Sequence, residues 1–446
     1  MSQHATHLVQ LEKPVYGGDF LARLDGKAIF VPLTLPGEQV QIRIVEDKRG
    51  YATAEVESLV QSAPQRVAPA CPHFGACGGC QYQHADYASQ LDFKQAILRE
   101  TLERAGVPAP AEISVLAGAP WHYRNRIRMA LDARGNAGYR GRGSHAVLPV
   151  SQCPIAAPLL LQAAAALPQA LAAVAPTLRP SEITLFCNAE QTALLAGVVL
   201  AAPVRIPARN LADELAAALR ERIPALCGLE IATAPRPHKP ARNSARAPGR
   251  TATQTSAQIL ARWGSDSLLY RAAGFEYRVD HGAFFQVNRW LVNALVDHVT
   301  AELSGQLAWD LFAGVGLFAR RLTANFAHVV AVESAPAAVA ALAHNLQGTA
   351  ASAVQADTLA FLRRKHVAAP DLIVLDPPRA GLGAPVTDAL ATLRAPALVY
   401  VSCDPATLAR DLRALIAAGY FLHSVTLADL FPQTFHLETV VHLRLA

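Results

Sequence analysis

The chain falls into three regions that differ in the spacing of their hydrophobic residues. In residues 1–61 apolar and polar side chains alternate, as at Val40, Ile42 and Ile44, and glycine-containing turn signals separate the alternating segments. A period of two places successive side chains on opposite faces of a strand. Short strands joined by such turns predict a small β-barrel over residues 1–61.

Residues 281–446 alternate segments typical of strands with segments typical of helices. Apolar runs of strand length stand at 307–313, 328–334, 352–357, 371–378 and 397–404. Helical periodicity marks 335–348 and 404–419. This alternation predicts βαβ units and a parallel α/β sheet with helices on both faces. Ligands bind such sheets at the carboxyl ends of the strands, so polar residues there are candidates for a site.

Residues 62–280 form the predicted middle domain, which mixes cysteines, helices and strands. Residues 86–106 predict a helix that ends at Gly106, and 182–203 predict a pair of strands. The uncharged segment 154–178 contains several prolines and predicts broken amphipathic helices rather than a membrane span. Because the N-terminus also lacks the apolar core of a signal peptide, we expect a cytoplasmic protein without a membrane segment.

Composition and charge narrow the class of protein. Of the 446 residues, 52% are hydrophobic and 17% charged, which favours a globular over a disordered chain. The net charge is +5, and the positive charge is concentrated in residues 62–280, which hold 23 basic and 15 acidic side chains. Seven cysteines in a chain of this length favour free, metal-bound or catalytic thiols over a disulfide scaffold.

The densest basic segment is 121–142. It has six arginines and one aspartate, with Trp121, Tyr123 and Tyr139 between them. Arginine pairs with phosphate and stacks on bases, and aromatic rings stack on bases too, so we expect nucleic-acid contact here. The alternative is a strand with a solvated basic face, and the two are compatible. A second basic run, 236–250, predicts a surface loop able to make non-specific phosphate contacts.

Two acidic residues and a glycine-rich turn suggest a site for an adenosine-containing cofactor. Asp310, Gly314 and Gly316 follow one predicted strand, and Glu333 ends the next. Glycines let a ligand approach the backbone, and an acid at the second strand end accepts hydrogen bonds from ribose hydroxyls. The full dinucleotide fingerprint is absent, which favours S-adenosylmethionine over NAD. A tight turn without a ligand is the structural alternative.

The next two strand ends carry the most reactive groups. Asp376 opens the sequence Asp-Pro-Pro-Arg, typical of methyltransferases that act on nucleobases or planar nitrogen, although the same residues alone could form a rigid turn. Cys403 stands one strand further along, just before a predicted helix, whose dipole is expected to favour the thiolate. We interpret Cys403 as a nucleophile. Glu438, in the alternating final strand, is the candidate base beside it.

Four further cysteines form a possible metal site. Cys71, Cys77 and Cys80 lie in one glycine-rich segment, and Cys153 is distant. Zinc sites usually present two Cys-x2-Cys pairs, whereas this three-plus-one spacing fits a [4Fe–4S] cluster better. Zinc and unbound thiols remain the alternatives.

Taken together, these segments resemble the RNA 5-methyluridine methyltransferases, the uracil-C5 enzymes of ribosomal and transfer RNA. The resemblance covers nearly the whole chain and is carried by the sequences FFQVN (284–288), DLFAGVG (310–316), LDPPRAG (375–381), VSCDPATLARDL (401–412) and FPQTFHLETV (431–440). It implies a class I (Rossmann-like) α/β methyltransferase domain over 281–446, preceded by a TRAM/OB-like barrel over 1–61 and a central α+β iron–sulfur domain over 62–280.

The resemblance also implies roles for single residues. Cys403 corresponds to the family nucleophile and Glu438 to its base, and the four cysteines correspond to the iron–sulfur ligands of the branch that modifies 23S ribosomal RNA. The implied cofactor-binding residues are Gln286, Phe312, Gly314, Glu333, Asp357 and Asp376.

Two positions depart from the family pattern. Leu317 stands where a polar residue is common, which removes one expected cofactor contact. Asp404 stands where Asn is common, and a carboxylate next to the nucleophile opposes thiolate formation unless it points away.

The implied activity is S-adenosylmethionine-dependent formation of 5-methyluridine, with 23S ribosomal RNA as the expected substrate. Transfer RNA is the alternative substrate, because some transfer-RNA enzymes share the cysteine pattern. A non-catalytic RNA-binding or assembly factor with a vestigial domain is the alternative of another class, and cytosine-C5 methylation is the other enzymatic one. A monomer is expected.

Overall fold

The structure is a computed structural model that describes residues 6–201, 208–234, 258–301, 303–365 and 368–446. The basic run 236–250 lies outside these residues. The chain forms two compact units, one built from Met1–Tyr123 together with Tyr270–Ala446 and the other from Arg124–Leu269. Each unit has its own buried core.

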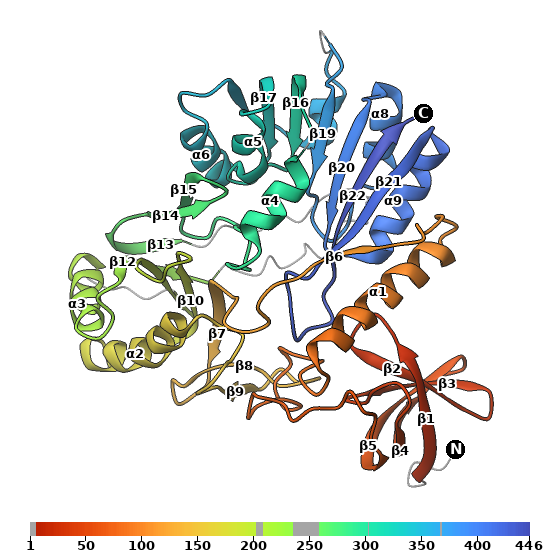
Figure 1. The fold of residues 1–446 in the computed structure, drawn as a ribbon. Helices are drawn as coiled ribbons and strands as arrows, with labels where there is room; N and C mark the ends of the chain where they lie inside the picture. The colour runs from red at the N-terminus through yellow and green to blue at the C-terminus, as the bar shows by residue number, and fades with distance from the viewer. Residues whose placement is uncertain (1–5, 202–207, 235–257, 302, 366–367) are drawn as a thin grey trace, which may run out of the picture. The chain divides into compact units, whose positions relative to one another are not determined.

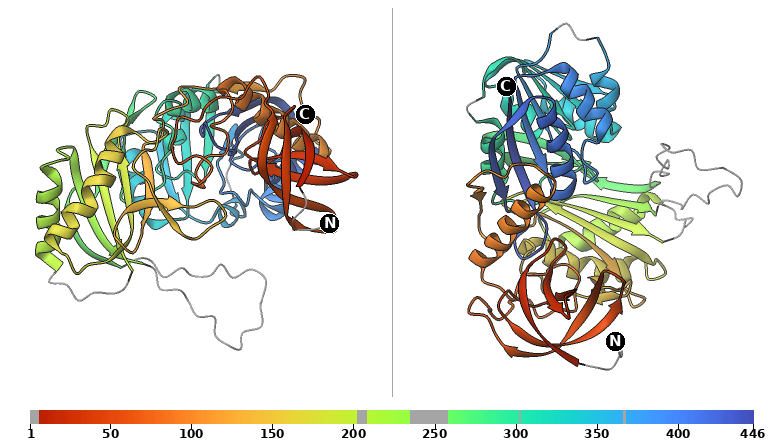
Figure 2. Two further views of the ribbon diagram at one scale, coloured as in Figure 1. Left: turned by 90° about the horizontal axis from the view of Figure 1, so that it is seen from below. Right: turned by 90° about the vertical axis from the view of Figure 1, so that its right-hand side faces the viewer.

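Strands within residues 6–61 form a closed five-stranded barrel, which confirms the predicted β-barrel fold (red in Figures 1 and 2). The strands are ordered β1-β2-β3-β5-β4, and Val40, Ile42 and Ile44 all point into its core. Closure removes the exposed strand edges that an open sheet of this size would have. The strands are β1 (Thr6–Pro14), β2 (Asp19–Leu24), β3 (Lys27–Pro32), β4 (Gln39–Asp47) and β5 (Tyr51–Gln61).

Helix α1 (Tyr87–Arg104) follows a loop of turns that carries three of the cysteines. Asp86 caps the helix by accepting a hydrogen bond from the Ser89 amide at 2.8 Å, and Gly106, with φ +74°, follows its end. A glycine in the left-handed region is a common helix stop. The buried face of α1 contributes Ile97, Leu98 and Leu102 to the core of the large sheet, so the helix belongs with that sheet.

The large sheet has eight strands in the order β18-β17-β16-β19-β20-β22-β21-β6 (Figure 1). Strands β16 to β20 are parallel, and β22 runs antiparallel between β20 and β21. The strands are β6 (Ser114–Leu116), β16 (Gly305–Leu311), β17 (Phe326–Glu333), β18 (Ala351–Gln355), β19 (Leu372–Leu375), β20 (Ala397–Ser402), β21 (Tyr420–Ala428) and β22 (Glu438–Leu445).

Helices alternate with these strands, as the pattern predicted for residues 281–446. They are α4 (Val292–Thr300), α5 (Leu317–Leu322), α6 (Pro336–Asn345), α7 (Thr358–Leu362), α8 (Ala384–Leu393) and α9 (Pro405–Ala417). A two-stranded ribbon, β14 (Ser267–Ala272) with β15 (Phe275–Asp280), precedes them. The α/β class is therefore confirmed for this part of the chain.

The second unit is a seven-stranded sheet with two helices, α2 (Pro158–Val174) and α3 (Ala208–Arg220), that share its core. The strands run in the order β13-β12-β11-β10-β7-β8-β9, and the expected pair over 182–203 is the antiparallel pair β10–β11. They are β7 (Arg126–Leu131), β8 (Ala137–Arg140), β9 (Val147–Pro149), β10 (Pro180–Cys187), β11 (Leu194–Leu200), β12 (Leu226–Thr233) and β13 (Ile259–Gly264).

The expected break within 154–178 is wrong. Helix α2 runs unbroken from Pro158 to Val174 with Pro168 inside it. Proline removes one backbone hydrogen bond, but Leu160, Leu167 and Leu171 are buried in the core of the unit, and this packing favours the continuous helix. In the described part of the chain no helix is both long and apolar enough to span a bilayer.

The compact units also divide the chain differently from the predicted boundaries at 61/62 and 280/281. Residues 62–123 pack with the large sheet, because α1 joins its core and β6 pairs in parallel with β21. Residues 124–269 alone form the second unit. The predicted middle domain is thus divided: residues 62–123 belong to the first unit, and residues 124–269 form the second.

Candidate active site

Strand pairing brings Cys403 and Glu438 together. Ser402, the last residue of β20, pairs with Thr439 of the antiparallel β22, so the residues that follow and precede them lie side by side. Asp376 comes directly after β19, whose Leu375 pairs with Tyr400 in the parallel neighbour. The carboxyl ends of β19 and β20 and the start of β22 therefore meet, and they collect the three residues predicted to carry the chemistry.

Burial and neighbouring negative charges raise the pKa of both Cys403 and Glu438. Glu438 is 5% exposed, and burial followed by the charge of Asp376 raises its pKa well above the usual range. The Cys403 thiol is half-buried, and burial, then Glu438, then Asp376, raise its pKa to about 11. The expectation that the helix dipole favours the thiolate is therefore wrong, because desolvation and two carboxylates outweigh the dipole.

Arg379 supplies a positive charge that opposes the effect of the carboxylates on Cys403 and Glu438. Its guanidinium lowers the pKa of both Cys403 and Glu438, and its Nη2 lies 3.0 Å from Nδ1 of His436, two residues before Glu438. The sequence contained this arginine within the Asp-Pro-Pro-Arg motif, but no role was predicted for it. Its position three residues after Asp376, just past the end of β19, is the signal that could have found it.

A cavity opens at the glycine-rich turn after β16, next to Asp376. Its lining comes from the 284–286 segment, the turn, the start of α5 and the end of β19, and comprises Phe284, Phe285, Gln286, Phe312, Ala313, Gly314, Val315, Leu317, Phe318 and Asp376. Four predicted cofactor-binding residues, Gln286, Phe312, Gly314 and Asp376, thus share one wall.

The turn is tight. Phe312 has φ +66°, a conformation that costs a non-glycine residue free energy and that clusters at functional sites. Gly316 has φ +90°, a conformation that favours glycine, and a Cβ there would lie 2.7 Å from Cδ1 of Leu342, so that side chain would have to shift. The backbone of the turn is therefore fixed at the cavity wall.

Asp310 lies beneath this turn with no exposure to solvent. Its Oδ2 accepts the Ala319 amide at 2.8 Å, while its Oδ1 has no hydrogen-bond partner among the described residues. Burial raises the pKa of Asp310 to about 8, with further contributions from Asp376 and Glu333, and burial raises the pKa of Asp376 to about 7. A cationic ligand would stabilise the ionised form of these carboxyls, so the site fits a group with a sulfonium or ammonium charge.

The remaining two predicted cofactor residues do not belong to the lining of this cavity. Glu333, at the end of β17, accepts the Gly314 amide at 3.0 Å and the Ser334 and Ala335 amides at 2.7 Å, which fixes its carboxylate beside the turn. Asp357 is exposed and caps α7 by accepting the Ala360 amide at 3.1 Å. Both stand at strand ends on the same edge as the cavity.

Two family profiles match parts of this chain. The family profile described as tRNA (Uracil-5-)-methyltransferase matches residues 263–445, and the TRAM domain profile matches residues 5–56. A 23S rRNA (uracil(1939)-C(5))-methyltransferase, RlmD, of Klebsiella pneumoniae (strain 342) is 34% identical over 440 residues, covering 95% of this chain and 92% of the relative.

Similarity extends to more distant proteins. An uncharacterized RNA methyltransferase of Thermotoga maritima is 30% identical over 445 residues and covers 98% of each chain. The crystal structure of the Pyrococcus abyssi tRNA (uracil-54, C5)-methyltransferase in complex with S-adenosyl-L-homocysteine has the same fold, with a TM-score of 0.75 at 23% identity, covering 98% of this chain and 99% of that one.

The chain belongs to the RNA uracil-C5 methyltransferase family. The N-terminal barrel of this methyltransferase is its TRAM domain, and its large α/β sheet is the catalytic domain.

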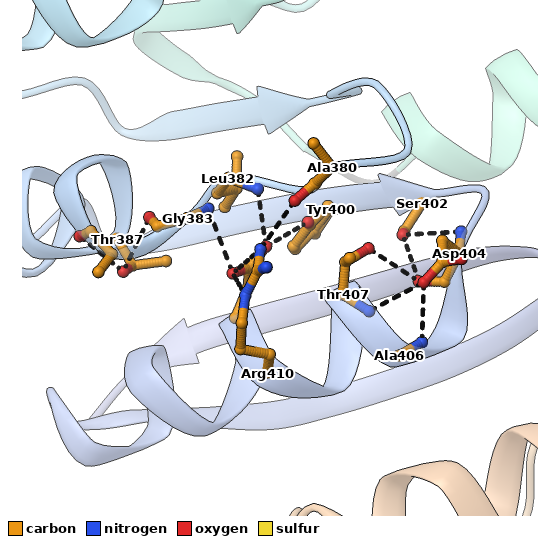
Figure 3. A network of polar contacts seen from close by, with 12 residues as sticks. Ala380, Leu382, Gly383, Thr387, Tyr400, Ser402, Asp404, Ala406, Thr407 and Arg410 are labelled. Carbon is orange, nitrogen blue, oxygen red and sulfur yellow. Dashed lines mark hydrogen bonds and ion pairs between the residues drawn. The ribbon is translucent and has the colours of Figure 1, made fainter. Parts of the chain in front are cut away.

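In the methyltransferase, Asp411 of α9 is hydrogen-bonded to the loop after Asp376. Figure 3 labels its neighbours Leu382, Gly383, Tyr400 and Arg410. The Asp411 carboxylate accepts the hydroxyl of Tyr400 at 2.9 Å and the amides of Leu382 and Gly383 at 2.7 and 3.3 Å. Arg410 donates to the same carboxylate and to the carbonyl of Ala380. Asp411 is 1% exposed, and these bonds tie α9 to the loop that follows β19.

Three of the predicted cluster ligands, Cys71, Cys77 and Cys80, lie in the loop before α1 of the methyltransferase, and Cys153 lies in the second unit. Burial and the neighbouring Cys71 raise the pKa of the Cys77 thiol, and the Gly79 amide donates to its Sγ at 3.4 Å. Thiols with an amide donor suit a cluster of soft metal ions. In the part of the chain that is described, no three His, Cys, Asp or Glu side chains are arranged to hold a metal ion.

The cysteine loop touches the segment that leads to Glu438. The amides of Gln81 and Tyr82 both donate to the carbonyl of Gln433 at 3.0 Å. The Gln81 side chain in turn accepts the Phe435 amide at 3.3 Å. The residue after Cys80 is thus hydrogen-bonded to the loop three to five residues before the predicted base.

The two departures from the family pattern have different consequences. Leu317 lies in the cavity lining as an apolar residue, so it offers no hydrogen bond to a cofactor there. Asp404 caps α9, where its Oδ1 accepts the amides of Ala406 and Thr407 at 3.1 and 3.0 Å (Figure 3).

Proposed function

We propose that the protein methylates C5 of a specific uridine in 23S ribosomal RNA, with Cys403 as the nucleophile and Glu438 as the base. The observation that carries this proposal is the pairing of β20 with β22, which sets these two residues side by side near a cavity that Asp376 lines. The whole-length similarity to a 23S rRNA methyltransferase supports the choice of substrate.

The chemistry requires a nucleophile, because uracil C5 alone is too weakly nucleophilic to take a methyl group. Sγ of Cys403 bonds to uracil C6, and the electron pair of the C5–C6 double bond moves into the ring as an enolate. This covalent step makes C5 electron-rich and divides one difficult reaction into easier ones. The thiol gives its proton to solvent, which reaches this half-buried group, and Arg379 assists that loss because its positive charge favours the thiolate.

The residues around the cavity fit S-adenosylmethionine as the methyl donor. Gln286, Phe312, Gly314 and Asp376, which line the cavity, would hold it together with Glu333 and Asp357 at the neighbouring strand ends. When bound, it supplies an electrophilic methyl group, which C5 takes.

Glu438 completes the reaction. As a carboxylate it removes the proton from C5, the C5–C6 double bond re-forms, and Sγ leaves C6. A carboxylate with a raised pKa is a stronger base than one in water, so the burial of Glu438 suits this role. Placed acid–base groups contribute typically ~10²–10⁴-fold to a rate.

The target base must leave its stack before Cys403 can reach C6, at a cost of a few kcal/mol. The TRAM barrel and the basic segment 121–142 are the proposed RNA-contacting surfaces. Two arginines of this segment lie in β7. The guanidinium carbon of Arg126 is 4.1 Å from the centroid of the Phe186 ring, and Nε of Arg128 is 2.5 Å from Oε1 of Glu182.

We also assign a structural [4Fe–4S] cluster to the four cysteines. The donor set and the hydrogen bonds from Gln81 and Tyr82 to Gln433 support a cluster that orders the loop before Glu438. Anaerobically purified Cys77→Ser protein should lose iron and sulfide, and residues 429–437 should exchange amide hydrogens faster. Cys227→Ser is the matched control, since that thiol donates to the Leu194 carbonyl outside the set. Zinc instead of iron, or unchanged exchange, would contradict the assignment.

Mapping 5-methyluridine in cellular RNA tests the proposed substrate. In a strain that lacks the gene, 5-methyluridine should disappear from one position in 23S ribosomal RNA and return when the gene is restored but not with Cys403→Ala. Loss from transfer RNA with ribosomal RNA unchanged would replace the proposed substrate. Sedimentation of the purified protein, expected to be a cytoplasmic monomer, tests its oligomeric state.

A further inference from the structure

Asp404 is the sequence neighbour of the proposed nucleophile, Cys403, and its carboxylate must point away from the thiol. Asp404 follows Cys403 directly, and a free anion at this position would oppose the thiolate. One of its oxygens, Oδ1, is committed to the N-terminus of α9 through the amides of Ala406 and Thr407 (Figure 3). The cap leaves Oδ2 to be satisfied by another group.

That group comes from the TRAM barrel. The hydroxyl of Tyr16, in the loop between β1 and β2, donates to Oδ2 of Asp404 at 3.3 Å. The Tyr16 ring meets the Phe435 ring edge-on, with centroids 5.5 Å apart and planes at 82°. The barrel, the nucleophile loop and the segment before Glu438 therefore meet at one tyrosine.

The loop that carries Tyr16 is itself fixed. Gly18 has φ +96°, and a Cβ there would lie 2.6 Å from Cγ of Gln81, the residue whose side chain accepts the Phe435 amide. The ring of Tyr16 also packs against the core of the catalytic sheet. Burial first, then the charge of Asp404 and, among smaller effects, that of Cys403 raise the pKa of the Tyr16 hydroxyl, which keeps it a donor.

We propose that Tyr16 is a positioning residue for methyl transfer: its hydroxyl holds the Asp404 carboxylate on the cap of α9 and away from Sγ of Cys403. The TRAM domain thereby contributes a side chain to the catalytic centre besides any contact with RNA. The inference rests on the proposed role of Cys403 as the nucleophile.

Removing only the hydroxyl tests it. Tyr16→Phe keeps the ring packing and should lower kcat by about tenfold or more, the size expected for a lost hydrogen bond to a charged group, with unchanged affinity for RNA. The pH curve for alkylation of Cys403, followed by mass spectrometry of its peptide, should move to higher pH. Tyr51→Phe, at a barrel tyrosine whose ring meets the Phe30 ring edge-on, should leave this curve in place.

The decisive variant is the double change Tyr16→Phe with Asp404→Asn. Asparagine caps helices as well as aspartate does but carries no charge, so it should restore both kcat and the alkylation curve. No rescue, an unshifted curve in Tyr16→Phe, or a rise in KM for RNA with unchanged kcat would each overturn the proposal. Alkylation does not depend on turnover, so its outcome is separate from failure of the proposed nucleophile, which would appear as activity in Cys403→Ala.

Discussion

Lys94 and Asp429 form an ion pair that solvent does not reach. Nζ of Lys94 lies 2.6 Å from Oδ1 of Asp429, and both side chains are 0% exposed. The same ammonium donates to the carbonyl of Phe431 at 3.0 Å, and the Tyr87 hydroxyl donates to Oδ2 of Asp429 at 2.9 Å. Helix α1 thus holds the beginning of the segment that ends at Glu438.

Breaking this pair should be costly. Lys94→Met leaves the Asp429 charge buried without its counter-ion, so we expect a loss of about 3–5 kcal/mol in the free energy of unfolding of the catalytic unit. Adding Asp429→Asn removes the stranded charge and should recover part of the loss. Denaturant titrations followed by circular dichroism would measure both.

Lys13→Met is the matched control. Lys13 pairs with Glu100 at 2.7 Å, but the two side chains are 42% and 31% exposed. An exposed pair contributes at most about 1 kcal/mol. Equal losses in the two lysine variants would show that burial of the Lys94 pair does not matter.

The sequence predicted the barrel, the α/β sheet and the strand ends that carry Cys403 and Asp376 because each follows from local spacing. It did not predict that Asp411, Lys94 and Tyr16 support the site. Their partners, Leu382, Asp429 and Asp404, are up to 388 residues away, and each taken alone looks like an ordinary surface or helix residue. Long-range hydrogen bonds leave no periodicity in a sequence.

The direction of the Cys403 pKa was missed for a related reason. The position before a helix suggested a lowered pKa, but burial and two carboxylates raise it to about 11. Those carboxylates, Glu438 and Asp376, come from other strands. Each had been recognised alone, and only the register of β19, β20 and β22 shows that they act on the same thiol.

Cofactor binding should release protons. Asp310 and Asp376, with pKa values of about 8 and about 7 in the ligand-free protein, are partly protonated near neutral pH. A sulfonium cation nearby lowers both values, so the affinity for S-adenosylmethionine should rise with pH across this range. Calorimetry in buffers of different ionisation enthalpy would count the protons.

S-adenosylhomocysteine provides the comparison, because its sulfur is neutral. It should release fewer protons than S-adenosylmethionine. Asp310→Asn, which retains an oxygen for the Ala319 amide, should reduce the number released by the cationic ligand. Equal release by both ligands would mean that the carboxyls do not sense the sulfonium.

Acid should destabilise the fold through His442. Its ring lies 5.5 Å from that of His298, and burial first, then the charges of His298, His423 and Arg444, lower its pKa to about 4, against the partial opposition of a hydrogen bond to the His298 backbone. Because an unfolded histidine titrates near ~6.5, the unfolded chain binds more protons between these values. Stability should therefore fall as the pH drops from about 6.5 to about 4, by roughly 3 kcal/mol.

His442→Gln cannot be protonated and should flatten this part of the stability curve. His328→Gln, at an exposed ring that contacts Ser352, should leave the curve unchanged. Parallel curves for the wild-type protein and His442→Gln would assign the acid sensitivity to other groups.

The most direct test of the account is the covalent bond between protein and RNA. Glu438→Gln leaves the nucleophile intact but removes the base, so with S-adenosylmethionine and a uridine-containing 23S fragment it should accumulate a methylated RNA–protein adduct that survives a denaturing gel. Adding Cys403→Ala should abolish both the adduct and methyl transfer. An adduct that persists without the thiol, or full turnover by Cys403→Ala, would contradict the assignment of Cys403 as the nucleophile.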